Sequence, residues 1–136
     1  MSIDVKITND NTQKVLDSME RATARALERI GLRAERIAKG LCHVDTGRLR
    51  NSITHATAQY SGQGTYVDND GNMFADATAK AIPFENSVYI GTNVQYGPYV
   101  EVGREGKGAY PFLKPAMEGH ISDFKKIIDD EFKNPV

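Results

Sequence analysis

The sequence predicts an α+β fold in which a long N-terminal helix and a C-terminal helix pack on a small antiparallel β-sheet. Two long segments repeat apolar residues at intervals of three and four, as amphipathic helices do. Between them lie short segments rich in β-branched residues, which are typical of strands, and a central stretch without sustained periodicity. We therefore expect one domain over residues 1–136, with residues 60–86 as a long loop or hairpin extension.

The composition is that of an ordinary globular protein of 136 residues, 40% hydrophobic and 26% charged, with a formal net charge of -1. This balance implies neither a nucleic-acid nor a membrane partner. No apolar run is long enough for a membrane span and the first residues lack the apolar core of a signal peptide, so we expect a cytoplasmic site of synthesis. The single cysteine, Cys42, is expected to be a small buried side chain near a helix end.

The first 41 residues predict a short strand followed by the long helix. Ile3, Val5 and Ile7 alternate with polar neighbours, which is the pattern of a strand. Several possible caps precede a helix over about Thr12 to Leu41, roughly 45 Å long at 1.5 Å per residue. One face of this helix carries its apolar or small residues: Val15, Met19, Ala22, Ala26, Ile30, Ala34, Ile37 and Leu41. A helix of this length exceeds what the domain needs, so it is expected to project or to form an interface.

The middle of the chain predicts a helical turn, a strand and a hairpin. Asp45 or Thr46 can cap a turn through Leu49, and the β-branched run from Ile53 to Tyr60 predicts a strand. The long loop from Tyr60 to Asn86 is rich in Gly, Asn and Asp. It is expected to form a hairpin with Thr65 to Val67 as one arm and a turn at Asp70 and Gly71, and to be mobile or dependent on a partner.

The last third predicts one strand and two helices. A strand over Ser87 to Gly91 is followed by a short helix over Tyr96 to Val102 that Gly103 ends. Residues 104–108 predict an exposed turn. The final helix begins near Pro111 or Phe112, and one apolar face holds Leu113, Met117, Ile121, Phe124, Ile128 and Phe132. Gly91 and Gly103 each end an apolar element, so both are expected to adopt backbone conformations that side chains tolerate poorly.

Three segments of the sequence carry a resemblance to a known family. They are DTGRLRNSI at Asp45 to Ile53, GTNVQYGPYVEVG at Gly91 to Gly103 and PFLKPA at Pro111 to Ala116. In this order they resemble the small neck proteins of long-tailed bacteriophages, the head-tail connector or tail-completion family. The resemblance covers about Val15 to Phe132, apart from the segment between Tyr60 and Asn86.

The resemblance implies a structural virion protein, made in the host cytoplasm, that forms a ring of six copies at the head-tail junction of a siphophage or prophage. Its partners would be neighbouring connector or head-completion proteins and tail-terminator or tail-tube proteins. Genomic DNA would pass through the lumen without sequence-specific binding, and no membrane would take part. No enzymatic activity, metal or cofactor is expected, because the residues offer no convergent set of acid, base, nucleophile or ligands.

Two sets of residues are the candidates for this role. The expected contacts with partners or other copies use arginines and acids of the two long helices and aromatic residues between them: Arg21, Arg25, Arg29, Arg33, Arg36, Tyr66, Phe74, Tyr96, Tyr99, Asp129 and Asp130. The expected turns and caps are Asp45, Thr46, Gly47, Gly91, Pro98, Gly103, Pro111 and Pro115.

The five arginines recur at intervals of four, four, four and three, so they form a cationic stripe beside the apolar face of the first helix. Like charges at this spacing repel, which indicates a compensating partner. One interpretation is a solvated face paired with Glu20, Glu28 and Glu35 of the same helix. The other is a contact with the acidic last helix of a neighbouring subunit in the ring, where Glu118, Asp123 and Glu131 accompany the two aspartates named above.

Two further functions stay open as alternatives. Asp45, Thr46 and Gly47 spell the catalytic triplet of aspartic proteases, but the cations Arg48 and Arg50 follow it where such an enzyme continues as a strand, so we favour a helix cap. The arginine stripe is also compatible with a DNA-binding module, which salt-dependent binding by the monomer would indicate. The three histidines match no metal-ligand spacing and are expected at the surface or with satisfied hydrogen bonds.

Overall fold

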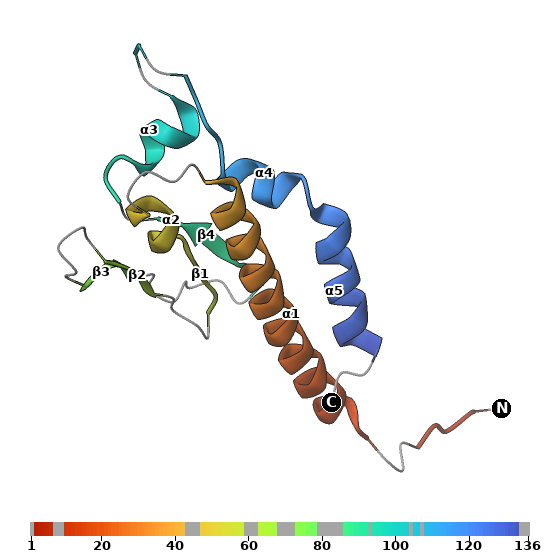
Figure 1. The fold of residues 1–136 in the computed structure, drawn as a ribbon. Helices are drawn as coiled ribbons and strands as arrows, with labels where there is room; N and C mark the ends of the chain where they lie inside the picture. The colour runs from red at the N-terminus through yellow and green to blue at the C-terminus, as the bar shows by residue number, and fades with distance from the viewer. Residues whose placement is uncertain are drawn as a thin grey trace.

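The computed structural model describes residues 2–6, 10–42, 47–58, 63–67, 73–78, 86–92, 94–103, 105–106 and 108–133 (Figure 1). Its elements follow in the order α1 (Thr12–Leu41), α2 (Arg48–Ser52), β1 (Thr54–Ala56), β2 (Gln63–Val67), β3 (Met73–Thr78), β4 (Tyr89–Gly91), α3 (Gly97–Val102), α4 (Leu113–Glu118) and α5 (Ile121–Lys133). The predicted α+β class and the long first helix are confirmed.

Helix α1 is the axis of the fold. In Figure 1, α5 runs alongside it on one side, while α2, β1 and β4 lie on the other. The side chains that α1 buries are almost all small: Ala22, Ala26, Ile30, Ala34 and Ala38, with Gly31 also buried. Small side chains let both layers approach the helix backbone closely, so α1 is packed from two sides.

The predicted apolar stripe of α1 is buried only in part. Val15 and Met19 were expected to face the core, but they are 54% and 45% exposed, and Leu41 is exposed at the other end. The ion pair between Arg25 and Glu131 lies near the end of α5, whose last residue is Lys133. The first turns of α1 therefore extend beyond the helix that covers the rest of the stripe.

Two antiparallel strand pairs make up the β structure. Strand β1 pairs with β4 in the register Thr54 with Gly91 and Ala56 with Tyr89, and every residue of β1 is buried. Strands β2 and β3 form the predicted hairpin, while its expected turn at Asp70 and Gly71 lies outside the described residues. The hairpin lies beside α2.

The core consists of two apolar clusters. One joins the C-terminal end of α1 to the segments that follow it and contains Ala38, Cys42, Leu49, Ile53, Val94, Phe112 and Ala116. The other joins α1 to α5 through Ile30, Ala34 and Phe124, with Val88 and Ile90 packed against it. Cys42 is buried, as predicted, and this burial raises the pKa of its thiol.

Two sequence predictions are wrong, namely a strand at the N-terminus and an unbroken last helix. Residues 2–6 form no strand, and Ile3 and Val5 are exposed. The final helix is broken in two at Gly119 and His120, where the Gly119 amide donates to the carbonyl oxygen of Pro115 at 3.0 Å. A Cβ at Gly119 would lie 2.7 Å from that oxygen, so the turn requires a residue without a side chain. The break lets α4 and α5 take separate directions against α1 (Figure 1).

Gly31 marks the closest approach between α1 and the sheet. A Cβ at this position would lie 2.8 Å from Cγ of the His55 ring and 3.0 Å from a methyl carbon of Val88. At Gly40, also in α1, a Cβ would have nothing within 4 Å. The first glycine is therefore a packing requirement, whereas the second is only a weak helix former.

We predict opposite effects of alanine at these two glycines. Gly31→Ala should lower the free energy of unfolding by about 1–3 kcal/mol, because the methyl group must push His55 off α1. Gly40→Ala should leave stability unchanged or raise it by up to about 1 kcal/mol, because alanine restricts the unfolded chain and favours the helix. Urea unfolding of both variants is the measurement. A Gly31→Ala protein as stable as the Gly40→Ala protein would contradict the close approach.

Candidate assembly site

The three segments that carry the family resemblance meet in one place. Leu49 and Ile53 come from the first segment, Val94 from the second, and Phe112 and Ala116 from the third. All five side chains belong to the same buried cluster, and Phe112, Ile53 and Ala116 have no exposed surface. Residues spread over most of the chain thus build a single joint at the C-terminal end of α1.

Hydroxyl groups join the first segment to the second. Ser52 Oγ donates to the carbonyl oxygen of Leu49 at 2.7 Å, so the short contact between Ser52 Oγ and Thr92 Oγ1 has the threonine as donor. The Val94 amide in turn donates to Thr92 Oγ1 at 3.1 Å. This chain of bonds satisfies Ser52, which is fully buried, and fixes α2 against the end of β4.

A carboxylate joins the second segment to the third. Glu101 of α3 accepts hydrogen bonds from the backbone amides of Phe112, Leu113 and Lys114, at 2.8, 2.9 and 2.8 Å. Those amides begin α4 and have no acceptor within the helix. Burial opposes the charge on Glu101, but the three amide donors and the charge of Lys114 outweigh it and hold the pKa of this carboxyl below its ordinary value. Glu101 thus caps a helix other than its own.

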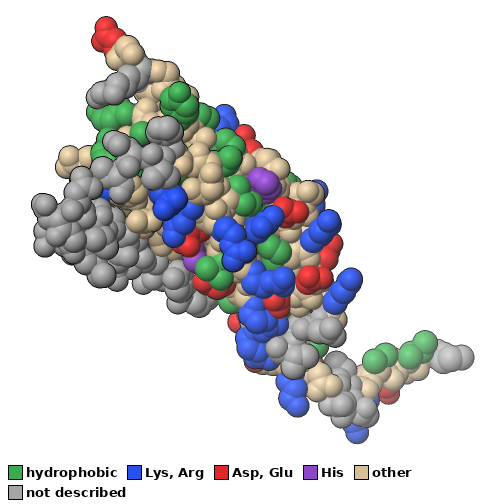
Figure 2. All heavy atoms as spheres, in the orientation of Figure 1, with side chains coloured by type: hydrophobic (Ala, Val, Ile, Leu, Met, Phe, Trp, Pro, Cys, Tyr) green, Lys and Arg blue, Asp and Glu red, His purple; other side chains and the backbone are tan. Residues whose placement is uncertain are grey.

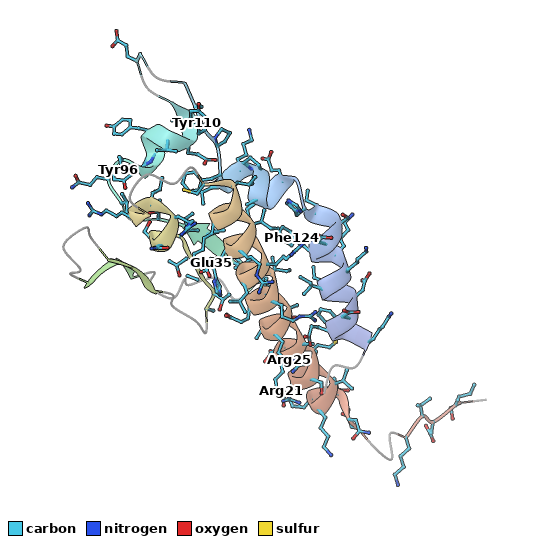
Figure 3. All side chains as sticks on the ribbon, in the orientation of Figure 1. Arg21, Arg25, Glu35, Tyr96, Tyr110 and Phe124 are labelled. Atoms are coloured by element: carbon cyan, nitrogen blue, oxygen red, sulfur yellow. The ribbon has the colours of Figure 1, made fainter. Side chains whose placement is uncertain are left out.

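Beyond this joint, α3 and the segment after it form an exposed tip with large side chains. Tyr96, Tyr99, Val102 and Tyr110 are 41%, 56%, 75% and 65% exposed. The first three recur every third residue and so share one face of α3. The Tyr110 amide donates to the Val100 carbonyl oxygen at 2.8 Å, which holds the segment before α4 beside α3. Figure 3 shows Tyr96 and Tyr110 at the end of the molecule opposite the start of α1. We call these four residues the aromatic tip.

The turns around the tip match the sequence predictions in part. Gly103 ends α3 with φ of 79° and ψ of 172°, as predicted, and Pro98 lies in the first turn of that helix. Gly91 does not adopt a positive φ and has open space where a Cβ would lie, so the prediction for this glycine is wrong. Pro111 is exposed just before α4, and Pro115 lies within it.

The start of α2 differs from the expected cap. The residue at its N-cap is Gly47, with φ of 85°, rather than Asp45 or Thr46, and the Asn51 amide donates to the Gly47 carbonyl oxygen at 2.9 Å. Asp45 and Thr46 themselves lie outside the described residues. The triplet runs directly into a helix, which is the setting expected for a structural turn rather than for a protease strand. The interface candidates Tyr66 and Phe74 lie on β2 and β3, whose side chains are also outside the description.

The arginine stripe of α1 meets α5 of the same chain. Arg25 contacts Glu131 at 2.9 Å, Arg29 contacts Glu131 at 3.0 Å and Asp130 at 3.8 Å, and Arg33 contacts Asp123 at 3.4 Å. Figure 2 shows basic and acidic side chains interleaved on this face. The hydrogen bonds from Arg25 and Arg33 lower the pKa values of Glu131 and Asp123 below their ordinary values.

For three of the five arginines the acidic partners come from α5 of the same chain, an arrangement that neither interpretation of the sequence proposed. Arg21 instead donates to Ser18 Oγ at 3.3 Å, and Arg36 and Asp129 are exposed. Exposed ion pairs contribute only about 0.2–1 kcal/mol each, so they orient α5 more than they stabilise it. A role for the stripe between subunits stays a prediction.

His55 of β1 occupies a buried position between two glutamates of α1. The ring is 1% exposed and lies over Gly31, with Nε2 2.8 Å from Glu28 Oε1 and Nδ1 3.2 Å from Glu35 Oε1. Burial opposes protonation, but the hydrogen bonds and charges of Glu35 and Glu28 outweigh it and raise the pKa of His55 above its ordinary value. The imidazolium form, which donates from both ring nitrogens, therefore matches the two carboxylates.

Neither Glu101 nor His55 was a candidate from the sequence. For His55 a signal exists, because Glu28, Gly31 and Glu35 lie at spacings of three and four and share one face of α1. A glycine between two carboxylates on one helix face indicates a cationic group packed over it. For Glu101 the signal is weaker, since its partners are backbone amides that any residue supplies.

Among the described residues, no group of three or more His, Cys, Asp or Glu side chains is placed to hold a metal ion. Within the same part of the chain, no helix combines the length and the apolar character that crossing a bilayer requires. Comparisons with protein-family models, with curated proteins and with solved structures found no match to this chain.

We predict that the cap on α4 is lost in acid. Glu101→Gln should lower the free energy of unfolding at neutral pH by about 1–2 kcal/mol, because a neutral amide accepts the three N–H bonds less strongly. The pKa of Glu101 is depressed in the folded state, so this stability is present above the unfolded pKa and disappears as pH falls through the folded pKa. The difference between wild type and variant should therefore vanish in acid. Glu105→Gln, at an exposed turn, is the control and should change stability by less than about 0.5 kcal/mol at any pH.

The contact of His55 with Glu28 and Glu35 predicts that the free energy of unfolding falls as the pH rises above neutrality. The folded pKa of His55 is raised, so its contribution is complete below the unfolded pKa, about 6.5, and is lost as pH rises through the folded value. Wild-type stability should fall over this window, and His55→Gln should remove the fall while lowering stability at pH 6. His120→Gln, on the turn before α5, should leave it in place. Denaturant unfolding from pH 5 to 9 tests this, and the same slope in wild type and His55→Gln would contradict a charged His55.

Proposed function

We propose that this chain is a structural virion protein that forms a ring at the head-tail junction of a long-tailed bacteriophage. The observation that supports this function best is the joint described above. The segments DTGRLRNSI, GTNVQYGPYVEVG and PFLKPA are in mutual contact through one cluster, the Ser52 and Thr92 hydroxyls and the Glu101 cap. Motifs that interlock in this way behave as one unit, which favours a common origin for the resemblance over chance matches of three short strings.

The joint supports this function because it carries an exposed aromatic surface on a rigid base. The tip side chains are large and solvent-facing, while α3 beneath them is fixed to α4 by Glu101 and to the segment before α4 by the Tyr110 amide. Tyrosine is enriched in protein interfaces because a ring with few rotatable bonds supplies much contact area at low entropic cost. In a ring, this tip would face the next copy or the adjoining connector or tail ring.

In this proposal the protein acts by shape. Its ring, of six copies by the family resemblance, joins a connector or head-completion ring on one side to a tail-terminator or tail-tube ring on the other. The genome passes through the lumen without sequence-specific contacts. The proposed DNA-binding alternative is less supported, because Arg25, Arg29 and Arg33 already bind carboxylates of α5. The protease alternative would need cleavage that Asp45→Asn abolishes.

We predict that the aromatic tip is needed for joining heads to tails. Tyr96→Ser with Tyr99→Ser should reduce the yield of joined particles at least about tenfold, because tyrosines are enriched among interface hot spots, whose truncation costs about 2 kcal/mol or more. The monomer should keep its stability to within about 1 kcal/mol, since both side chains are exposed. Tyr89→Ser, a similarly exposed tyrosine on β4, is the matched control and should join normally. Normal joining by the double variant would contradict a role for the tip.

A further inference from the structure

The first residues form an arm outside the helices and strands, with every described residue exposed. We call residues 2–6 the N-terminal arm; every one of them is exposed, with Ile3 at 83% and Val5 at 86%. Figure 1 shows the arm leading away from the start of α1. Its sequence alternates apolar and polar residues as a strand does, so Ile3 and Val5 would share one face and Asp4 and Lys6 the other. The arm has the pattern of a strand without a partner.

The β2–β3 hairpin has the complementary feature, an edge without a partner. Strand β2 is the inner strand, beside α2, and β3 is the outer strand, which pairs with β2 alone among the described residues. The three pairs from Thr65–Ala75 to Val67–Met73 are regular, and a bulge between Gly64 and Thr65 ends this regular stretch. A two-stranded sheet is marginally stable, and a third strand on its open edge satisfies a row of backbone groups.

The arm and the hairpin of one chain lie far apart (Figure 1). The hairpin lies beside α2, and α2 packs against the end of α1 through the cluster that holds Leu49 and Ala38. Ala38 is about 39 Å from Thr12 along the helix axis at 1.5 Å per residue. Lys6 can lie at most about 22 Å from Thr12, even with the connecting residues fully extended. Lys6 therefore cannot reach the level of Ala38 on its own helix, and we place the pairing between two copies.

We propose that the N-terminal arm of one copy adds as a third strand to the open edge of β3 in the next copy. Main-chain hydrogen bonds would give the contact its affinity, and Ile3 and Val5 would enter the same face of the extended sheet. Because the arm and the hairpin are two different surfaces of the chain, the contact is head-to-tail, and such contacts close into a ring when the rotation between copies closes. This inference names the contact within the proposed ring and rests on that function.

Hydrogen exchange of the full-length protein tests the pairing directly. In samples shown by sedimentation to be assembled, the amides of residues 73–78 and of the arm should exchange at least about tenfold more slowly than at monomer concentrations. The double variant Asp4→Pro, Val5→Pro removes two adjacent backbone donors, which point to opposite sides of a strand, and should abolish this protection. Asp4→Ala, Val5→Ala loses the same side chains but keeps the donors, so it should retain protection of β3. Both variants should stay folded, because the arm is exposed.

Three results would overturn the inference. The first is an assembled wild-type protein whose arm and β3 amides exchange as in the monomer. The second is equal protection of β3 in the proline and alanine variants. The third is a wild-type protein that sediments as a monomer at millimolar concentration, with β3 exchanging as fast as in the proline variant. The proposed function is judged separately by joining of heads to tails, which still succeeds if a ring forms through other contacts.

Discussion

The arrangement of the whole molecule depends on the contact between His55 and α1. A buried imidazole needs a partner for each nitrogen, and α1 supplies Glu28 and Glu35 on either side of a glycine that leaves room for the ring. This contact fixes β1, and through it β4 and the start of the aromatic tip, on one side of α1. Removing either glutamate would leave the buried imidazolium with only one carboxylate. The free-energy cost of this change exceeds the net stabilisation that the intact contact provides.

The second constraint is the cap that Glu101 places on α4. Because α4 begins directly after the segment that contains Tyr110, the same carboxylate fixes the tip at one end and sets the path into α5 at the other. The arginines of α1 then hold α5 through Glu131 and Asp123. The contacts of His55 and Glu101, together with the exposed ion pairs, thus position the segments on both sides of a helix whose own buried side chains are mostly alanine.

The sequence predicts the elements of this fold better than their contacts. The bounds of α1 follow from an apolar spacing that continues for thirty residues, and the end of α3 follows from Gly103. The break at Gly119 was missed because Met117, Ile121 and Phe124 keep helical spacing across it, so only backbone geometry reveals the turn. The contacts of His55 and Glu101 join residues from separate segments, and periodicity within one segment carries no information about them. The arginine stripe follows from the sequence, but its pairing with acidic residues of α5 in the same chain does not.

These features combine into a chain with an exposed tip at one end, an unpaired arm at the other, and a charged helix pair between them that is already satisfied within one copy (Figure 1). The decisive experiment is an electron cryo-microscopy map of the phage neck. We expect a ring of this chain at the head-tail junction, with the arginines of α1 bound to α5 of the same copy and the aromatic tip in contact with another copy or an adjoining ring. A neck without this chain would show that the proposed role is wrong, and a ring whose tips face only solvent would show that the aromatic tip is not its contact surface.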